Sequence, residues 1–427
     1  MKRRLLPILM TLVLVCALPI WAAFVTSGDV TNPLVSTAGA AELTLQGMID
    51  QANAGDTIKL SSNTEVHATL QITKNLTLDL NGHVLKMTGD GSVLRVSDRA
   101  TLTITDSRPQ NPHTEPYAGL PAGGVITGGK GPNVTGIYYD YVGGAVFLEN
   151  GTTLKLEGGT LTGNSGSSIY IDGATLVMSG GTITGKTVGV HNNVGTFTMT
   201  GGRITGRSDR GVYVYNGNMT MSGTAYIGGN PNARKEDIYV YESDHKHTDL
   251  SVTGGTIAGK VRIVFLESLG PTQEELKAAA NSVVKEQGVF DGHIKVEKGT
   301  SGTCVDYNSV NFIDEVAKTR TLKLVLQPNA VEEPETPATV NGREFMYWTK
   351  EGASEAWDFN TVIEVPLTLY AVRTPASSSG GYYYHPTTDT KADDAKGSPK
   401  TADPGVALYA ALSLLSLTGL TCATKKR

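Results

Sequence analysis

The chain has 427 residues, a formal net charge of −5, 18% charged residues and 50 glycines. Lys and Arg cluster only at the two termini, so nucleic acid is not expected as a partner, because phosphate binding needs a concentrated basic surface. Of the three cysteines, Cys16 and Cys422 lie in hydrophobic terminal segments, which leaves Cys304 without a partner for a disulfide framework. No paired CxxC spacing occurs, and we predict neither a metal site nor a cofactor.

The N-terminus has the plan of a secretory signal peptide. Lys2, Arg3 and Arg4 precede an apolar run from Leu5 to about Ile20. We therefore predict a signal peptide over residues 1–23, with cleavage there or as late as residue 40. A retained membrane helix is the alternative.

A short amphipathic helix is predicted next, within residues 41–60. Leu45, Met48, Ile49 and Ala52 fall on one helical face, and Gly55 is expected to end the helix. The sequence GDTIKL then begins a strand.

A repeat dominates the body of the chain. LKLEGGTLTG, LVMSGGTITG, FTMTGGRITG, MTMSGTAYIGG and LSVTGGTIAG begin at Leu154, Leu176, Phe197, Met219 and Leu250. Each unit divides into three short strands, the third being AVFLE, SIYID, GVHNN, GVYVY or DIYVY. Three strands in about 22 residues correspond to one coil of a solenoid, which buries an apolar column only when coils stack. An antiparallel sandwich is the alternative.

GDTIKL followed by LTLDLNGHVL (76–85) resembles the opening of pectin-lyase-like β-helices of bacterial surface proteins. The resemblance covers residues 41–265. The predicted fold is therefore all-β, a right-handed parallel β-helix with an N-terminal capping helix and a small β-rich C-terminal module.

The outer face of the third strands carries the candidate site. One aromatic or imidazole ring per coil falls in register there, and Tyr215 and Tyr241 widen the stripe. Such a row can stack on sugar faces or anchor a protein, or it can be an aromatic ladder that stabilises adjacent strands. The ligand-binding candidates are Phe147, Tyr170, His191, Tyr213, Tyr215, Tyr239 and Tyr241.

Residues 266–330 contain a predicted amphipathic helix at 271–287, whose face is Leu276, Ala279, Ala280 and Val283. It either caps the solenoid or begins a small α+β unit. Residues 338–373 resemble a β-grasp-like repeat of Gram-positive surface proteins. The shared motif consists of Gly342, Phe345, Trp348, Trp357-Asp358-Phe359 and Leu367-Thr368-Leu369-Tyr370-Ala371.

The C-terminus resembles the sorting signal of Gram-positive surface proteins. A polar spacer (374–397) precedes residues 398–427, in which an apolar segment (406–423) is long enough to span a membrane and Lys425-Lys426-Arg427 follows. The motif is Ser398, Pro399, Lys400, Thr401 and Ala402, where the family has LPxTG. The resemblance implies attachment of Thr401 to peptidoglycan by a sortase, and a plain membrane anchor is the alternative.

These features predict an extracellular protein held to the wall or membrane at its C-terminus. The leading function is a non-catalytic adhesin that binds a glycan or a host or neighbour-cell protein. A polysaccharide lyase or glycoside hydrolase is the alternative, and Glu149 and Asp172 are the stacked carboxylates considered for it. A structural stalk without a ligand is the third reading, and no catalytic residue is assigned.

Overall fold

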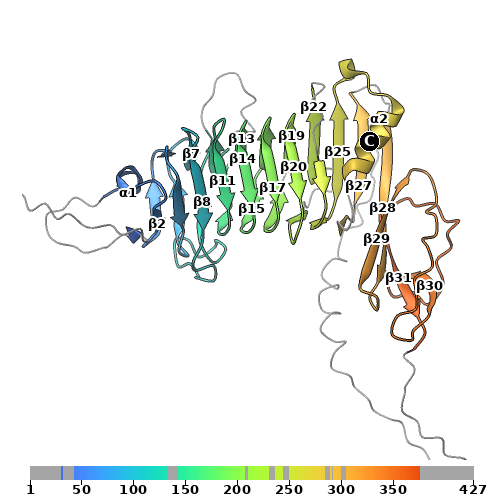
Figure 1. The fold of residues 1–427 in the computed structure, drawn as a ribbon. Coiled ribbons are helices and arrows are strands. Elements are labelled where there is room, and N and C mark those ends of the chain that lie inside the picture. The colour runs from blue at the N-terminus through green and yellow to red at the C-terminus, as the bar shows by residue number, and fades with distance from the viewer. Residues whose placement is uncertain are drawn as a thin grey trace, which may run out of the picture. The chain divides into compact units, whose positions relative to one another are not determined.

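A computed structural model describes residues 30–31, 43–131, 143–206, 210–229, 236–243, 250–283, 289–290, 292–299 and 304–375. Over these ranges β-strands are the main secondary structure, most of them short, and there are two α-helices, α1 (Leu45–Gln51) and α2 (Gln273–Val283) (Figure 1). A short 3₁₀ helix covers Glu267–Leu269.

Three parallel sheets run through this structure (Figure 1). The first sheet contains β1 (Val30–Thr31), β2 (Thr57–Lys59), β5 (Leu76–Asp79), β8 (Thr101–Thr105), β11 (Thr153–Leu156), β14 (Thr175–Met178), β17 (Thr196–Met199), β20 (Asn218–Met221) and β23 (Leu250–Val252). The second contains β3 (Thr64–Val66), β6 (Val84–Met87), β9 (Val125–Thr127), β12 (Thr160–Leu161), β15 (Thr182–Gly185), β18 (Arg203–Gly206), β21 (Tyr226–Ile227), β24 (Thr256–Ile257) and β26 (Val289–Phe290). The third contains β4 (Leu70–Ile72), β7 (Leu94–Val96), β10 (Val146–Leu148), β13 (Ser167–Asp172), β16 (Val188–Asn193), β19 (Arg210–Tyr215), β22 (Ile238–Glu242), β25 (Lys260–Phe265) and β27 (His293–Lys298).

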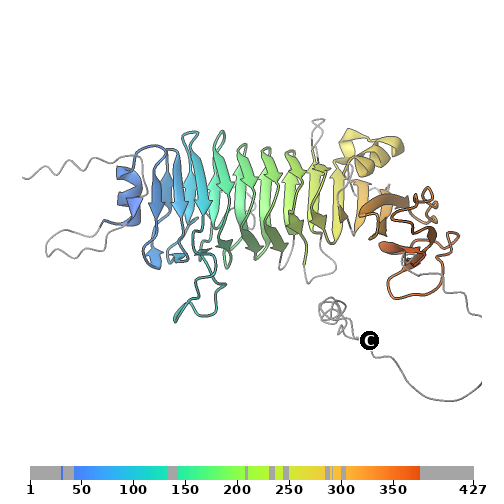
Figure 2. The same cartoon turned by 60° about the horizontal axis from the view of Figure 1, so that its bottom comes forward.

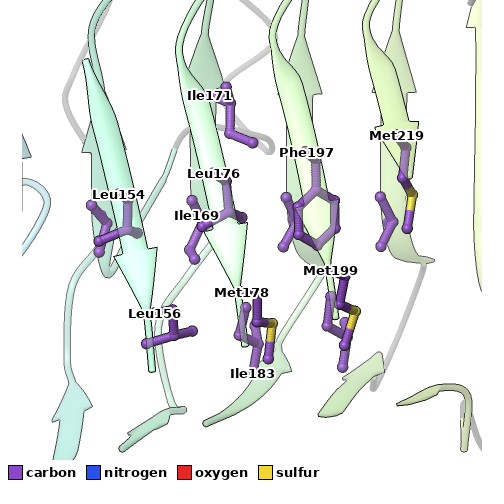
Figure 3. Packing of buried hydrophobic residues seen from close by; sticks show 14 of the residues in the cluster. Leu154, Leu156, Ile169, Ile171, Leu176, Met178, Ile183, Phe197, Met199 and Met219 are labelled. Atoms are coloured by element: carbon purple, nitrogen blue, oxygen red, sulfur yellow. The ribbon is translucent and has the colours of Figure 1, made fainter. Parts of the chain in front are cut away.

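The chain visits the three sheets in turn, so each coil adds one strand to each sheet. Identical positions of successive coils pair directly; Phe197 of β17, for example, lies opposite Leu176 of β14 and Met219 of β20. The inward side chains stack in rows along the solenoid, and those of β11, β14, β17 and β20 are fully buried (Figure 3). The structure confirms the predicted parallel β-helix.

Glycine is required at the corners because successive turns stack closely. Gly202 has φ +79°, and a Cβ atom there would lie 2.5 Å from the carbonyl oxygen of Gly180 in the preceding coil. A side chain would therefore meet both backbone strain and a steric clash.

The predicted N-terminal capping helix is present as α1. Leu45 and Ile49 are buried in the solenoid core, and Met48 and Ala52 pack against it. Thr44 is the N-cap, with its Oγ1 accepting a hydrogen bond of 3.1 Å from the Gly47 amide. The helix ends at Gln51, which is earlier than the predicted stop at Gly55.

Parallel pairing continues past residue 265, where the sequence repeat ends. β26 pairs with β24 and β27 pairs with β25, and α2 takes the place that a first-sheet strand has in other coils. Leu276, Ala280 and Val283 of α2 are fully buried in the solenoid core, at the opposite end of the coils from α1 (Figure 2). A helix in place of a strand removes the apolar alternation by which the repeat is recognised.

The strands after residue 303 are joined to the third sheet but are mostly antiparallel. β28 (Cys304–Asp314) pairs with β27, with β29 (Thr319–Leu326) along most of its length, and with β31 (Leu367–Arg373), which pairs with β30 (Phe345–Lys350). A second core consists of Val310, Phe312, Val325, Val331, Trp348, Ile363 and Leu369. This core draws on strands before residue 338, so the predicted segment 338–373 contains only part of it.

Candidate functional site

The five predicted rings, Phe147, Tyr170, His191, Tyr213 and Tyr239, occupy one continuous column on the outer face of the third sheet. Each is the direct pairing partner of the next on β10, β13, β16, β19 and β22. The strands direct these positions away from the core because the alternate residues, such as Val212 and Val214, are fully buried inside. We call these five residues the aromatic column.

Neighbouring rings of the aromatic column are in contact. Phe147 and Tyr170 stack with centroids 5.5 Å apart, and the Tyr170–His191 pair is edge-on at 4.8 Å. His191–Tyr213 and Tyr213–Tyr239 are tilted pairs at 4.6 and 5.4 Å. These separations are those of favourable aromatic pairs, so the column stabilises the pairing of its strands.

The middle of the column is covered. Tyr170 is 5% exposed and His191 is 8% exposed, whereas Phe147, Tyr213 and Tyr239 are half-buried. Burial, together with the Asp172 carboxylate, raises the pKa of Tyr170 to about 12. The accessible rings are therefore found at the two ends of the column and do not form one open stripe.

A group of four tyrosines forms the widest accessible part. Tyr213 and Tyr215 on β19 lie in register with Tyr239 and Tyr241 on β22, and all four are half-buried. Tyr215 and Tyr241 are parallel within 9°, with centroids 5.8 Å apart. We call these four residues the tyrosine quartet.

Polar groups fix one side of the tyrosine quartet. The Ser243 hydroxyl donates to the Tyr215 hydroxyl oxygen at 3.0 Å and accepts from Asn216 Nδ2 at 2.7 Å. The Ser243 amide donates in turn to Asn216 Oδ1 at 2.8 Å. Asn216 adopts φ +47° in the turn after β19, a conformation that Asn tolerates well. The Tyr215 hydroxyl is thus held in place before any ligand arrives.

Two arginines hold the other side. The Arg210 guanidinium lies 4.1 Å from the Tyr239 ring centroid, and that of Arg262 lies at 5.6 Å. Both pair with Glu236, at 3.8 Å from Arg210 and 3.5 Å from Arg262, and Arg262 also pairs with Glu297. Burial raises the pKa of the Tyr239 hydroxyl, and this effect outweighs the two arginines, which act to lower it.

Neither arginine is among the site residues predicted from the sequence. Arg262 occupies on β25 the position that Tyr239 has on β22, so extending the register of the aromatic column by one coil would have found it. Extending the register does not identify Arg210 or Glu236, because neither occupies a position of the aromatic column. Their ion pair depends on how the side chains of neighbouring coils pack.

The two carboxylates considered for hydrolysis of a glycosidic bond each interact with a different side chain. Glu149 forms an ion pair with Arg95, and Asp172 accepts a hydrogen bond of 3.0 Å from Asn193 Nδ2. Within the described ranges, no group of three or more His, Cys, Asp or Glu residues is arranged to hold a metal ion.

Several sequence predictions fall outside the described residues. These are the signal peptide (1–23), the spacer (374–397) apart from its first two residues, the motif Ser398–Ala402 and the apolar segment 406–423. None of the helices in the described part of the chain has the length and apolar character needed to cross a membrane.

Comparisons of this chain with protein-family models, with curated proteins and with solved structures find no match.

Proposed function

We propose that this protein is a surface-anchored, non-catalytic adhesin that binds a glycan through the tyrosine quartet. The observation that carries the proposal is the set of four half-buried tyrosines, in register on adjacent strands and bordered by hydrogen-bonding and charged groups. Sugar rings present a C–H face that packs on aromatic rings and hydroxyl groups that need polar partners at the edge.

A glycan fits this surface better than a protein anchor does. The four rings lie two on each of two adjacent strands and each stays half-exposed, whereas protein hot spots centre on fully desolvated pockets. A repeated strand spacing of about 4.8 Å offers successive contacts to a chain of sugar units.

A structural stalk is the second candidate, and the middle of the aromatic column favours it. Tyr170 and His191 are buried against their neighbours, so these two rings contribute to cohesion between coils and offer little surface. A stalk depends on the buried rings in the middle of the column, whereas an adhesin depends on the accessible rings of the tyrosine quartet. Substitutions in the quartet therefore distinguish the two functions.

The test is binding of the purified full chain to a glycan array, with Tyr215→Ala/Tyr241→Ala compared with wild type. Each lost ring–sugar contact removes on the order of 1 kcal/mol, so the double variant should bind at least ten-fold more weakly. Phe147→Ala is the control, because Phe147 is a half-buried ring on the outer face of the same sheet but lies outside the quartet. Circular dichroism checks that each variant is folded.

Equal binding by wild type and the double variant would contradict the adhesin proposal. Binding to no glycan by wild type would leave the stalk as the better account.

Anchoring by a sortase is the second part of the proposal, and it rests on the resemblance of Ser398–Ala402 and the segment after it to a sorting signal. In a Gram-positive host, wild type should remain with peptidoglycan after detergent extraction. Thr401→Ala should be shed or extracted with the membrane, because the sortase would no longer meet a threonine side chain on the residue whose carbonyl it attacks. A Thr401→Ala variant that stayed linked to the wall would overturn the sortase assignment, and Thr390→Ala in the spacer serves as control.

A further inference from the structure

A pocket lies at a corner of the solenoid where one coil is longer than its neighbours. The paired positions Met199 and Ile204 are five residues apart, whereas Met221 and Ile227 in the next coil are six residues apart. The strands on both sides of this corner keep their register, so the extra residue must project outward from the turn. Gly223 in this turn is exposed and has φ +62°.

The pocket beside this turn has a volume of about 570 Å³. It spans three successive coils, because Arg203, Tyr226 and Thr256 in its lining are direct pairing partners on β18, β21 and β24. The side chains that bring polar groups to the lining are those of Arg203, Thr224, Tyr226, Thr253 and Thr256. Insertions in a repeat protein often gather on its binding face, so the extra residue and the pocket together mark this corner as a candidate site.

Arg203 supplies the charge of the pocket. Its guanidinium lies 3.7 Å from the centroid of the Tyr226 ring, where cation–π attraction holds it in place. Arg203 forms no ion pair with any described residue, whereas Arg210 and Arg262 both pair with Glu236. The described residues that line the pocket include no carboxylate. The lining therefore presents one positive charge without an acidic group to neutralise it.

Hydroxyl groups surround this charge. Within the described part of the chain, the hydroxyl groups of Thr224, Tyr226 and Thr256 have no hydrogen-bond partner. That of Thr253 donates to the Met221 carbonyl oxygen at 3.4 Å. A ligand can pair with the first three groups without breaking an internal contact. Because the rest of the lining consists of glycines and one alanine, the pocket suits a polar ligand better than an apolar peptide side chain.

We propose that this pocket is a second binding site, which takes an acidic sugar by its carboxylate. The planar guanidinium of Arg203 matches a carboxylate in shape and charge and can donate two parallel hydrogen bonds to it. The hydroxyl groups of Thr224, Tyr226 and Thr256 pair with hydroxyl groups of the same sugar. The pocket lies at the second sheet and the tyrosine quartet lies on the third, so this inference does not rest on glycan binding by the quartet.

The test compares acids with their neutral esters by calorimetry on the purified full chain. Oligogalacturonate and sialyllactose are each measured beside their methyl esters, and acetate is measured as a carboxylate without a sugar. Wild type should bind at least one of the two acids about ten-fold more tightly than its ester, because the ester cannot form a charge-assisted pair with Arg203. The preference should weaken as salt is added, since Arg203 is exposed.

Substitutions in the pocket should change this preference in a graded way. Arg203→Gln should abolish the preference for the acid, because it removes the positive charge. Tyr226→Leu keeps the charge but removes the ring that holds the guanidinium, so it should reduce the preference by less. Arg108→Gln is the matched control, because it makes the same change at an exposed arginine that forms no ion pair with a described residue and does not line the pocket.

The outcomes separate this inference from the proposed function. Equal binding of acid and ester by wild type, binding of no probe, or equal loss in Arg203→Gln and Arg108→Gln would overturn the second site. Acetate bound as tightly as the acidic sugars would overturn the assignment to a sugar. Tyr215→Ala/Tyr241→Ala should keep the acid preference of wild type, whatever the glycan array shows for the quartet. Loss of the preference in that double variant would assign it to the quartet and overturn the inference.

Discussion

In the solenoid, a buried side chain packs against the residue at the same position of the next coil, as Phe197 does between Leu176 and Met219. In residues 304–375, by contrast, Phe312 packs against Trp348 and Phe359, which come from later parts of the chain with no repeat relation to it. The first arrangement is a sum of nearest-neighbour contacts, whereas the second is a single small core. One continuous sheet therefore connects a stack of coils, whose stability depends on contacts between neighbouring coils, to a small core that is expected to unfold as a single unit.

β28 is where the two arrangements meet. Val305 and Tyr307 near its start belong to the solenoid core, and Val310 and Phe312 farther along belong to the second core. Whether the two cores unfold together therefore depends on how much of their stability is shared through this strand.

Truncating one ring in each core tests whether the two cores unfold together, and it should change the free energy of unfolding more than the other substitutions proposed. Phe197→Ala and Phe312→Ala each remove a ring that is no more than 1% exposed, which should cost about 3–5 kcal/mol. Trp348 and Trp357 both lie in residues 304–375, so in a Trp21→Phe background fluorescence reports on that region, and far-UV circular dichroism reports mainly on the solenoid.

Phe197→Ala should shift the denaturant midpoint seen by circular dichroism and leave the fluorescence midpoint nearly unchanged. Phe312→Ala should do the reverse. Thr196→Ala, an exposed change beside Phe197, is the control and should shift neither. Equal shifts of both midpoints in Phe197→Ala would show that the two cores unfold as one cooperative unit and would contradict their separate unfolding.

Two buried aspartates, one in the solenoid and one in the second core, should make the stabilities of these two regions respond to pH in opposite directions. The expected change in stability is smaller than that of the ring truncations. Asp237 in the solenoid is 4% exposed, and burial raises its pKa from 3.8 to about 6. Gly259 makes room for it, since a Cβ there would lie 2.1 Å from Asp237 Oδ2. Asp314 in the second core is also buried, but hydrogen bonds from Arg373 at 2.6 and 2.9 Å outweigh burial and lower its pKa.

The signs follow from proton binding. The folded solenoid binds the Asp237 proton more tightly than the unfolded chain, so this contribution is fully present below pH 3.8 and is lost as pH rises through about 6. Asp314 contributes stability above its unfolded pKa of about 3.9, and that contribution is lost as pH falls through its lower folded pKa.

Between pH 7 and pH 4.5, acidification should therefore stabilise the solenoid by on the order of 1–3 kcal/mol through Asp237. Asp237→Asn should remove that part of the pH dependence from the circular dichroism midpoint. Asp314→Asn should lower the fluorescence midpoint at pH 7, and its difference from wild type should shrink as pH falls below the unfolded pKa of the carboxyl. Glu333→Gln, at an exposed glutamate, is the control; a pH dependence in Asp237→Asn as large as in wild type would contradict the assignment.

Much of the fold could be predicted from the sequence because its cause is local and repeated. The alternation of Val212 and Val214 with Tyr213 and Tyr215 defines a strand, and its recurrence once per coil defines the pairing register. The helix α2 and its apolar face, with Leu276 and Ala280, were predicted, but the sequence left open whether it caps the solenoid or begins a separate unit, since it lies where other coils place a strand. The second core was only partly predicted, because Val310 and Phe312 join Trp348 across a long stretch of chain.

The sequence by itself determined which rings share a column, because a coil of nearly constant length returns each strand to the same face. Only the tertiary structure decided that Tyr170 and His191 are covered while the tyrosine quartet remains accessible. It also decided that Arg210 and Arg262 meet over Tyr239, where both pair with Glu236. Exposure and ion pairing depend on side chains from neighbouring coils, and no periodicity in a single strand specifies them.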